Sequence, residues 1–413
     1  MNIKSLLLVA CSFLASCASV SYTNVRTQEG ALTAQYDSLR LLADSYPEKV
    51  EIRYAKGLKV NYLPDGIHIL ISNPDPKAKA TAPQELVLPM APLLVSPTGE
   101  SKDTPAPVPG SAPVPEASAS GKGKFICTTA LQLGNFEVLG LEDRIVGINS
   151  LKNIFSERIL TQLSDGRTKR LGKEGNFDVE SVIALHPDYI FVSASKYGGF
   201  EALKDCGIPL VLHHGYKETN PLGQAEWIKL IGLLTGETRR ANAVFDHIER
   251  EYHALCKLVT DYLSSPEGKA KGRPTVLSGR QLRDGWYVMG GKSYMAQLFH
   301  DAGAQYIMDD INDTGGVTLD FETVYARGIN ADFWQVDGSF DTAFTLDDLI
   351  IEDPRYGDIA AHKNKKVIFC NLTMTPYREL AGVAPHIMLA DFIRAFHPNL
   401  LPDHKPKFYD FLQ

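Results

Sequence analysis

Two glutamates occupy the same position in a short sequence motif, here called the repeated phrase, that occurs twice in the chain. Glu180 stands in residues 178–184, DVESVIA, and Glu322 stands in residues 320–326, DFETVYA. Each phrase has the pattern of a helix start, and each is followed by a break and by a short apolar run that predicts a buried strand. The repeat predicts two similarly built lobes, each with one exposed carboxylate on the same part of its surface. The alternative is that both glutamates only favour the dipole of their own helices.

Metal chemistry has one candidate position. His213 and His214 end a predicted strand, where either could meet a metal or a haem iron. Neighbouring residues on a strand point to opposite faces, so the pair cannot chelate one ion together. Either histidine alone therefore remains a candidate axial ligand.

Signatures of catalysis and of nucleic-acid binding are lacking in the sequence. It has no G-x-S-x-G, H-E-x-x-H or complete P-loop motif. Residues 290–293, GGKS, resemble the end of a phosphate loop but lack its earlier glycine, so they predict a turn and a helix start. The net charge of −7 and the pI near 5.9 disfavour a nucleic-acid partner. We expect a protein that is not an enzyme and binds no nucleic acid.

The amino terminus predicts a lipid anchor. Lys4 is followed by an apolar run, residues 6–10, that is too short to cross a bilayer, and Leu14, Ala15, Ser16 and Cys17 form a lipobox. Residues 1–17 are therefore predicted to be a lipoprotein signal peptide that ends at a lipidated Cys17. Acyl chains, and not a transmembrane helix, would hold the mature protein at the membrane. The alternative is an ordinary secretory signal in which Cys17 is incidental.

The other cysteines point away from zinc. After Cys11 and Cys17, four remain, without CxxC spacing and in apolar surroundings: Cys127, Cys206, Cys256 and Cys370. Small buried thiols are the favoured interpretation, and a disulfide between two of them stays open.

A chain of 413 residues is too long for one ordinary core. Strands alternate with helical patterns, which predicts α/β lobes with mainly parallel sheets. Near Trp286 and Tyr287 we expect an aromatic turn. The predicted division is a signal peptide (1–17), an N-terminal extension with a β-hairpin (18–95), a Pro/Ala/Ser-rich disordered loop (96–124), an N-terminal lobe (125–235), a linking helix (236–262) and a C-terminal lobe (263–413).

The linking helix has the clearest periodicity. No Pro or Gly occurs between Glu237 and Val259. Apolar residues recur at steps of three and four, as an amphipathic helix of about six turns requires: Ala241, Phe245, Ile248, Tyr252 and Leu255.

Four phrases in this order resemble a known family. They are residues 222–229 before the long helix, 285–291, 301–303 and 397–402. Over about residues 125–413 the chain resembles a substrate-binding lipoprotein of an ABC importer, of the class III type that serves ferric siderophores, haem and cobalamin. The hairpin and the strand before the disordered loop fit relatives from Bacteroidetes-like bacteria.

The resemblance implies two three-layer α/β lobes joined by one long rigid helix, with a ligand cleft between them. It implies that Glu180 and Glu322 dock onto arginines of an ABC permease dimer, one per lobe, through charge-assisted bonds. The protein would be a monomeric lipoprotein anchored to a membrane in the periplasm, without an intrinsic cofactor. Its ligand would be an iron complex (a ferric siderophore or haem) or a corrinoid such as cobalamin.

In such proteins the ligand contacts come from loops at the carboxyl ends of the strands. Aromatic side chains suit a flat macrocycle or a catecholate, and Arg suits its carboxylates. The bland alternative for each aromatic is a loop or core position. Two other functions stay open: a tetrapyrrole-handling enzyme such as a chelatase, and an adhesive or structural lipoprotein. The ligand-binding candidates are Thr128, Thr129, Lys152, Tyr197, Tyr216, Arg280, Trp286, Tyr287, Phe340 and Tyr377.

Overall fold

The computed structural model describes residues 36–37, 39, 43–79, 81–89, 123–149, 151, 154–173, 175–193 and 200–413. All of the predicted signal peptide and most of the predicted disordered loop lie outside these residues. Among the helices so described, none combines the length and apolar character needed to cross a bilayer.

An antiparallel sheet of three strands precedes the lobes. It consists of β1 (Leu58–Leu63), β2 (Gly66–Ile71) and β3 (Gln84–Leu88), in that order. β1 and β2 form the predicted hairpin, with Leu63 opposite Gly66. β3 corresponds to the strand that the resemblance implies before the disordered loop. It pairs with β2 across a longer loop, residues 72–83.

The first lobe is built on a parallel sheet with strand order β10-β9-β4-β5-β6. Buried aromatic and β-branched side chains form its strands, as for a sheet covered on both faces. The strands are β4 (Phe125–Cys127), β5 (Ile145–Ile148), β6 (Lys169–Arg170), β9 (Tyr189–Val192) and β10 (Leu210–Leu212), with a ribbon of β7 (Gly172–Lys173) and β8 (Asn176–Phe177). The helices are α3 (Ala130–Leu139), α4 (Glu157–Ser164), α5 (Val179–Ala184), α6 (Glu201–Lys204), α7 (Pro221–Ala225) and α8 (Ile228–Thr235).

The second lobe has a sheet with order β14-β11-β16-β17-β18, parallel except for β18. A separate antiparallel sheet, β12-β13-β15, lies beside it. The strands are β11 (Thr275–Ser278), β12 (Arg280–Leu282), β13 (Gly285–Met289), β14 (Gln305–Tyr306), β15 (Gly316–Leu319), β16 (Phe333–Gly338), β17 (Val367–Asn371) and β18 (Asp410–Phe411). The helices are α11 (Tyr294–Asp301), α12 (Phe321–Gly328), α13 (Leu346–Glu352), α14 (Ala360–Lys363), α15 (Tyr377–Leu380) and α16 (Pro385–Phe396).

The two parallel sheets share one topology. Taken in chain order, β4, β5, β9 and β10 of the first lobe correspond to β11, β14, β16 and β17 of the second. In both sheets the first strand lies between the second and the third, and the fourth lies outside the third. The repeated phrase supplies α5 with β9 in one lobe and α12 with β16 in the other. The duplication indicated by the sequence is therefore a duplication of architecture.

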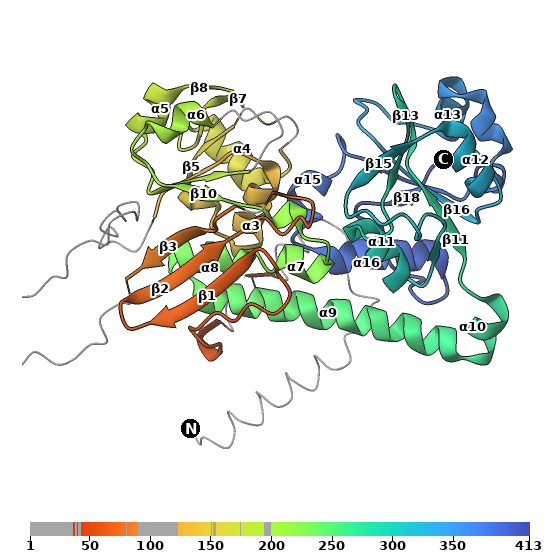
Figure 1. The fold of residues 1–413 in the computed structure, drawn as a ribbon, viewed down its shortest axis with the longest axis horizontal. Coiled ribbons are helices and arrows are strands. Elements are labelled where there is room, and N and C mark those ends of the chain that lie inside the picture. The colour runs from red at the N-terminus through yellow and green to blue at the C-terminus, as the bar shows by residue number, and fades with distance from the viewer. Residues whose placement is uncertain are drawn as a thin grey trace, which may run out of the picture.

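A long helix, α9 (Thr238–Ser264), runs along both lobes, which stand on the same side of it (Figure 1). The predicted apolar stripe is buried throughout. The helix runs beyond the predicted Val259, until Ser265 leaves helical geometry and begins α10 (Pro266–Lys271). At 1.5 Å per residue, its 27 residues span about 40 Å. The prediction of two α/β lobes joined by one long helix is confirmed.

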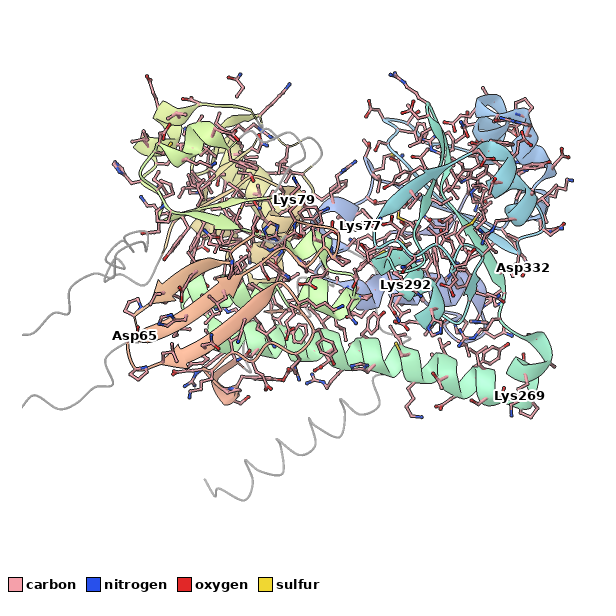
Figure 2. The ribbon with its side chains drawn as sticks, in the orientation of Figure 1. Asp65, Lys77, Lys79, Lys269, Lys292 and Asp332 are labelled. Carbon is pink, nitrogen blue, oxygen red and sulfur yellow. The ribbon has the colours of Figure 1, made fainter. Side chains whose placement is uncertain are left out.

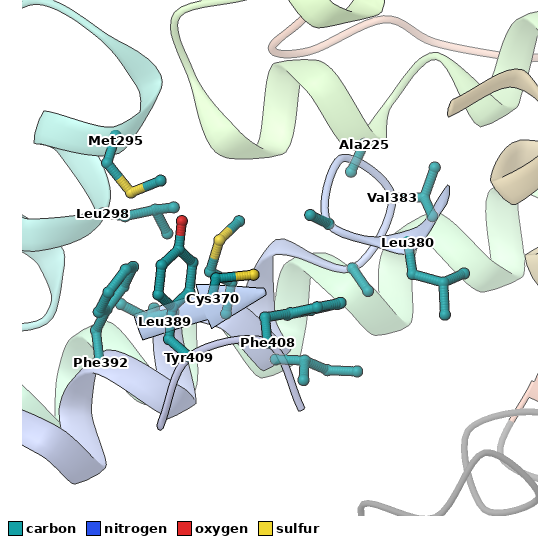
Figure 3. Close-up of a cluster of buried hydrophobic side chains, with 14 of the residues drawn as sticks. Ala225, Met295, Leu298, Cys370, Leu380, Val383, Leu389, Phe392, Phe408 and Tyr409 are labelled. Atoms are coloured by element: carbon teal, nitrogen blue, oxygen red, sulfur yellow. The ribbon is translucent and has the colours of Figure 1, made fainter. Parts of the chain in front are cut away.

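The lobes also meet directly. Gly134 of α3 lies against the backbone of Glu379 in α15, and the amide of Phe155 donates to both Glu379 carboxylate oxygens at 3.2 Å. Figure 3 shows Ala225 of α7 close to Val383 and Leu380, next to second-lobe side chains such as Leu389 and Tyr409. One hydrophobic core thus continues from lobe to lobe.

The structure corrects the predicted aromatic turn and settles the state of the four remaining cysteines. Residues 285–289 form strand β13, paired on both sides, and not an aromatic turn, because Trp286 and Val288 alternate into the core while Tyr287 points outward. All four cysteines left open above are free thiols, with Cys127 and Cys370 buried and Cys206 and Cys256 half-buried.

Candidate functional site

Two of the predicted ligand-binding residues of the second lobe lie near the carboxyl ends of β11 and β16. Arg280 follows β11 by two residues, and Phe340 follows β16 by two. Arg280 Nη1 donates to Glu352 Oε1 and Oε2 at 2.7 and 2.6 Å, and its guanidinium lies 5.5 Å from the Phe340 ring centroid. The Phe340 ring stacks on that of Phe344 at 4.0 Å. The structure thus places the predicted Arg280 and Phe340 next to each other and adds Phe344, which the sequence did not single out.

Tyr287 belongs to the same surface. It is 37% exposed and lies opposite Arg280 in the β12–β13 ladder. Burial raises the pKa of its hydroxyl, and the charges of Asp337 and Asp313 raise it further. Tyr287 is therefore a neutral hydrogen-bond donor at physiological pH.

Trp286 belongs to the interior, whereas Tyr377 is half-buried at the edge of the core. Trp286 is 0% exposed, packs against Trp334 and Tyr356, and donates its indole N–H to the Ser278 carbonyl at 3.1 Å. It fills the second-lobe core, because adjacent residues of β13 face opposite sides. Burial raises the pKa of Tyr377 well above its usual value, and its ring packs edge-on against Tyr409. For Trp286 the structure favours the core alternative, whereas the role of the half-buried Tyr377 stays a prediction.

Asp337 is a residue of this region that the sequence did not single out. It stands at the end of β16 and accepts a 2.6 Å hydrogen bond from the Tyr409 hydroxyl. Burial raises the pKa of its carboxyl group, and this hydrogen bond works in the opposite direction. Its position directly after an apolar strand was the only signal available in the sequence.

On the first lobe, Thr128 and Thr129 follow β4 as predicted. Thr129 caps α3 in a capping box with Gln132, whose Oε1 also accepts from the Thr128 amide at 2.7 Å. The Thr128 hydroxyl is buried without a hydrogen-bond partner among the described residues. Thr129 thus has a structural role, whereas Thr128 retains a free hydroxyl.

His213 and His214 follow β10 and are both buried. The His213 ring lies 4.8 Å from that of Trp227, and the His214 ring lies edge-on to the same indole at 6.4 Å. Burial lowers the pKa of His213 to about 3, so it is neutral. Within the described ranges, no group of three His, Cys, Asp or Glu side chains is placed to hold a metal ion. The two rings pack as core aromatics around Trp227.

Tyr216 lies at the exposed end of the same segment, with Lys217 Nζ 5.4 Å from its ring centroid. Lys152, Tyr197 and the lipidation candidate Cys17 lie outside the described residues. Their roles remain predictions.

The two repeated glutamates have matching surroundings. Asp178 and Asp320 cap α5 and α12, and each accepts from the amide and the hydroxyl of the residue three positions later, Ser181 or Thr323. Glu180 and Glu322 stand in the first turn of these helices and are exposed. Glu322 is within 3.5 Å of Arg355. Figure 1 shows α5 and α12 in the part of each lobe that lies away from α9.

A surface cavity of about 380 Å³ lies elsewhere. It is lined by residues at the amino ends of β11, β16 and β17, such as Pro274, Asp332 and Lys366, and by the end of α16. None of the predicted ligand-binding residues lines it, and it lies at the opposite ends of the second-lobe strands.

Comparison with known proteins assigns the fold to a family. The sequence pattern of the periplasmic binding protein family matches residues 126–372. An uncharacterised lipoprotein of Methanocaldococcus jannaschii is 27% identical over 276 residues, which cover 66% of this chain and 63% of that protein, less than two thirds of its length.

Solved structures agree in fold. A periplasmic haem-binding protein from Pseudomonas aeruginosa superposes with a TM-score of 0.54 at 16% identity, over 70% of this chain and 98% of that one. A protein of an ABC-type Fe³⁺-hydroxamate transport system from Saccharomonospora viridis gives a TM-score of 0.51 at 16% identity, over 67% of this chain and 93% of that one.

Proposed function

Because the chain belongs to the periplasmic binding protein family, a family of solute-binding proteins, we propose that it is the substrate-binding lipoprotein of an ABC importer. It captures a ferric siderophore, haem or cobalamin in the periplasm and delivers it to the permease. The observation that carries the proposal is the surface formed by Arg280, Phe340 and Tyr287 at the carboxyl ends of the second-lobe strands.

The chemistry of this surface suits such ligands. The stacked rings of Phe340 and Phe344 provide an apolar face for a macrocycle or a catecholate. Arg280 uses Nη1 for Glu352, and a guanidinium has five N–H donors in all, so others remain for a ligand carboxylate. The neutral Tyr287 hydroxyl adds a donor. The haem-binding and Fe³⁺-hydroxamate relatives guide the choice of probes.

Attachment to the membrane follows from the proposed lipidation of Cys17, and contact with the permease from Glu180 and Glu322. The exposed first-turn position of both glutamates supports this part of the proposal, since it leaves each carboxylate accessible to a guanidinium.

Fluorescence titration tests ligand capture. The three buried indoles, Trp227, Trp286 and Trp334, can report a bound chromophore by energy transfer without touching it. The probes are hemin, a ferric tricatecholate, a ferric hydroxamate and cobalamin. We expect saturable quenching by one of them with a Kd below about 10 µM.

Arg280→Ala should weaken that binding by about tenfold, because a charged hydrogen bond contributes about 1.5 kcal/mol. The control is Arg167→Ala, which removes an exposed first-lobe arginine paired with Asp165. Binding by none of the four probes would overturn the proposal. Conversion of hemin to another product would favour the chelatase alternative.

A further inference from the structure

The loop between β2 and β3 is held to the first lobe at both ends. At its start, the Ser72 amide donates to the Gly57 carbonyl at 2.9 Å, and the Gly57 amide in turn donates to Glu218 Oε1 of the first lobe at 2.9 Å. At its end, the Gln84 side chain bonds to edge strand β10 twice, donating to the Leu210 carbonyl at 2.6 Å and accepting from the Leu212 amide at 2.9 Å. The loop therefore moves with the first lobe at these two points.

Between these points, residues 72–79, which we name the strap, have a defined turn. Pro74 and Pro76 restrict the backbone on either side of Asp75. Asp75 Oδ1 accepts from the Lys77 amide at 2.9 Å, and its backbone carbonyl accepts from the Ala78 amide at 2.9 Å. The turn fixes the direction in which the Lys77 side chain projects from the strap.

Two ion pairs connect the strap to both lobes. Lys217 Nζ of the first lobe donates to Asp75 Oδ2 at 3.2 Å. Lys77 Nζ donates to Asp313 Oδ2 of the second lobe. Asp75 thus both binds the first lobe and shapes the turn that presents Lys77 to the second. Figure 2 shows Lys77 between the lobes, with Lys292 on the second-lobe side.

The acceptor on the second lobe is held in place. Asp313 Oδ1 accepts from the Gly315 amide at 3.0 Å, and the Asp313 carbonyl accepts from the Lys292 amide at 2.9 Å. The side chain of Asp313 is 19% exposed, whereas that of Lys77 is 60% exposed. The lysine is therefore the mobile partner of the pair, and the carboxylate is the fixed one.

The strap reaches the proposed ligand surface. The Tyr287 hydroxyl lies directly against Gly316, three residues after Asp313, and the charge of Asp313 contributes to the raised pKa of the tyrosine. On the first lobe, Lys217 follows the ligand-binding candidate Tyr216 directly. The strap precedes residues 126–372, the part that matches the family, so it is an addition to the two lobes.

We propose that the strap is a latch that links the two lobes beside the ligand surface through Lys77 and Asp313, and that it detaches from Asp313 when ligand enters or leaves. The gating role rests on the proposed function, whereas the latch itself does not. An exposed ion pair is weak enough to break and reform readily. Such a pair controls access without locking the site.

Spin-label distance measurements on the ligand-free protein test the latch. One label is placed at Lys79→Cys on the strap and one at Leu282→Cys, an exposed position of the second lobe. Cys206 and Cys256 are changed to Ser to avoid labelling the half-buried thiols. The unaltered strap should give a narrow distance distribution. Asp313→Asn and Lys77→Ala should each raise the detached population about two- to fivefold.

The distance distribution of the double variant, Asp313→Asn with Lys77→Ala, should be no broader than that of either single variant, because both substitutions remove the same ion pair. The matched control is Asp310→Asn, which removes a nearby carboxylate that pairs with Arg327 within the second lobe. The latch is overturned when Asp313→Asn leaves the distribution unchanged, or when Asp310→Asn broadens it equally.

A second measurement addresses gating, with hemin as the probe. Asp313→Asn should raise the association and dissociation rates together by about two- to fivefold and leave the ratio nearly constant. Equal rates in both proteins would refute gating while the latch could stand. Failure of hemin to bind to either protein would count against the haem form of the proposed function, and the ligand-free distances would still decide the latch.

Discussion

At the scale of single residues, the buried histidines link folding to pH. Burial lowers the pKa of His213 to about 3 and that of His247 to about 4, with smaller contributions from His214 and Arg250 respectively. In the unfolded chain both would titrate near 6.5. Below that pH the unfolded chain gains protons that the folded protein does not accept.

The free energy of unfolding should therefore fall as pH drops from about 6.5 towards 4. The expected loss is about 2 kcal/mol per buried histidine at pH 5 relative to pH 8. His213→Phe should reduce this loss, whatever its effect on stability at pH 8, and urea unfolding at both pH values measures it. His300→Phe, at an exposed position, is the control. An unchanged pH dependence in His213→Phe would contradict the prediction.

At this scale the sequence predicted which residue types lie near each other better than it predicted which way their side chains point. Arg280 and Phe340 lie together as expected, because residues that follow neighbouring parallel strands meet at one edge of a sheet. Trp286 and Tyr287 were predicted together but face opposite sides of β13, which follows from the register of a strand that the sequence did not reveal. Asp313 and Lys77 could not be paired from sequence, because only tertiary structure brings them together.

At the scale of elements, the contact of α3 with α15 sets how the lobes are joined. A Cβ on Gly134 would collide with the backbone carbonyl of Glu379, which has no free rotamer to move away. In an ordinary helix, Gly→Ala is stabilising by about 1 kcal/mol. Here we expect Gly134→Ala to destabilise the protein by about 1–3 kcal/mol, because overpacking forces the helices apart.

Urea unfolding measures the change. The control is Gly357→Ala, where the nearest atom to a new Cβ is the end of the flexible Ile350 side chain at 3.3 Å. Its effect should stay below about 1 kcal/mol. Stabilisation by Gly134→Ala would show that α15 yields easily and that the lobes are loosely joined.

The elements with strong periodicity were predicted well. The stripe of α9 and the strand Tyr189–Val192 are present as expected, because burial of one face or of a whole strand leaves a clear pattern. The short strand β14 was missed. Its two residues, one exposed and one buried, are too few to produce a periodic signal.

At the scale of the whole molecule, the internal repeat supports the proposal that one glutamate of each lobe docks onto the permease. The same capped helix start recurs in both lobes and presents Glu180 and Glu322 at equivalent places of two sheets with the same strand order. The sequence repeat predicted this symmetry because each copy contains a helix start and the strand that follows it. The sequence of this chain carries no information about the surface of the proposed permease that would receive the two glutamates.

Two separated carboxylates would fix the protein on its permease at two points, so their effects should combine. Glu180→Ala and Glu322→Ala should each reduce ligand uptake by about tenfold, as the loss of one charge-assisted contact predicts. The double variant should abolish uptake, while the affinity for ligand in solution stays unchanged because neither residue lies at the ligand surface. Uptake of labelled ligand by cells that express each variant, with titration of the purified proteins, measures both effects.

The chain offers matched controls for these carboxylates. Glu157 stands in the first turn of α4 after the cap Ser156, and Asp347 stands in the first turn of α13 after the cap Thr345; both are exposed. Glu157→Ala with Asp347→Ala removes one helix-start carboxylate from each lobe, and it should cost only the helix-dipole contribution of about 0.3–1 kcal/mol in stability per residue. The docking proposal is contradicted when uptake persists in the Glu180→Ala, Glu322→Ala protein or when it fails equally in the control. Both glutamates would then only stabilise the starts of their helices.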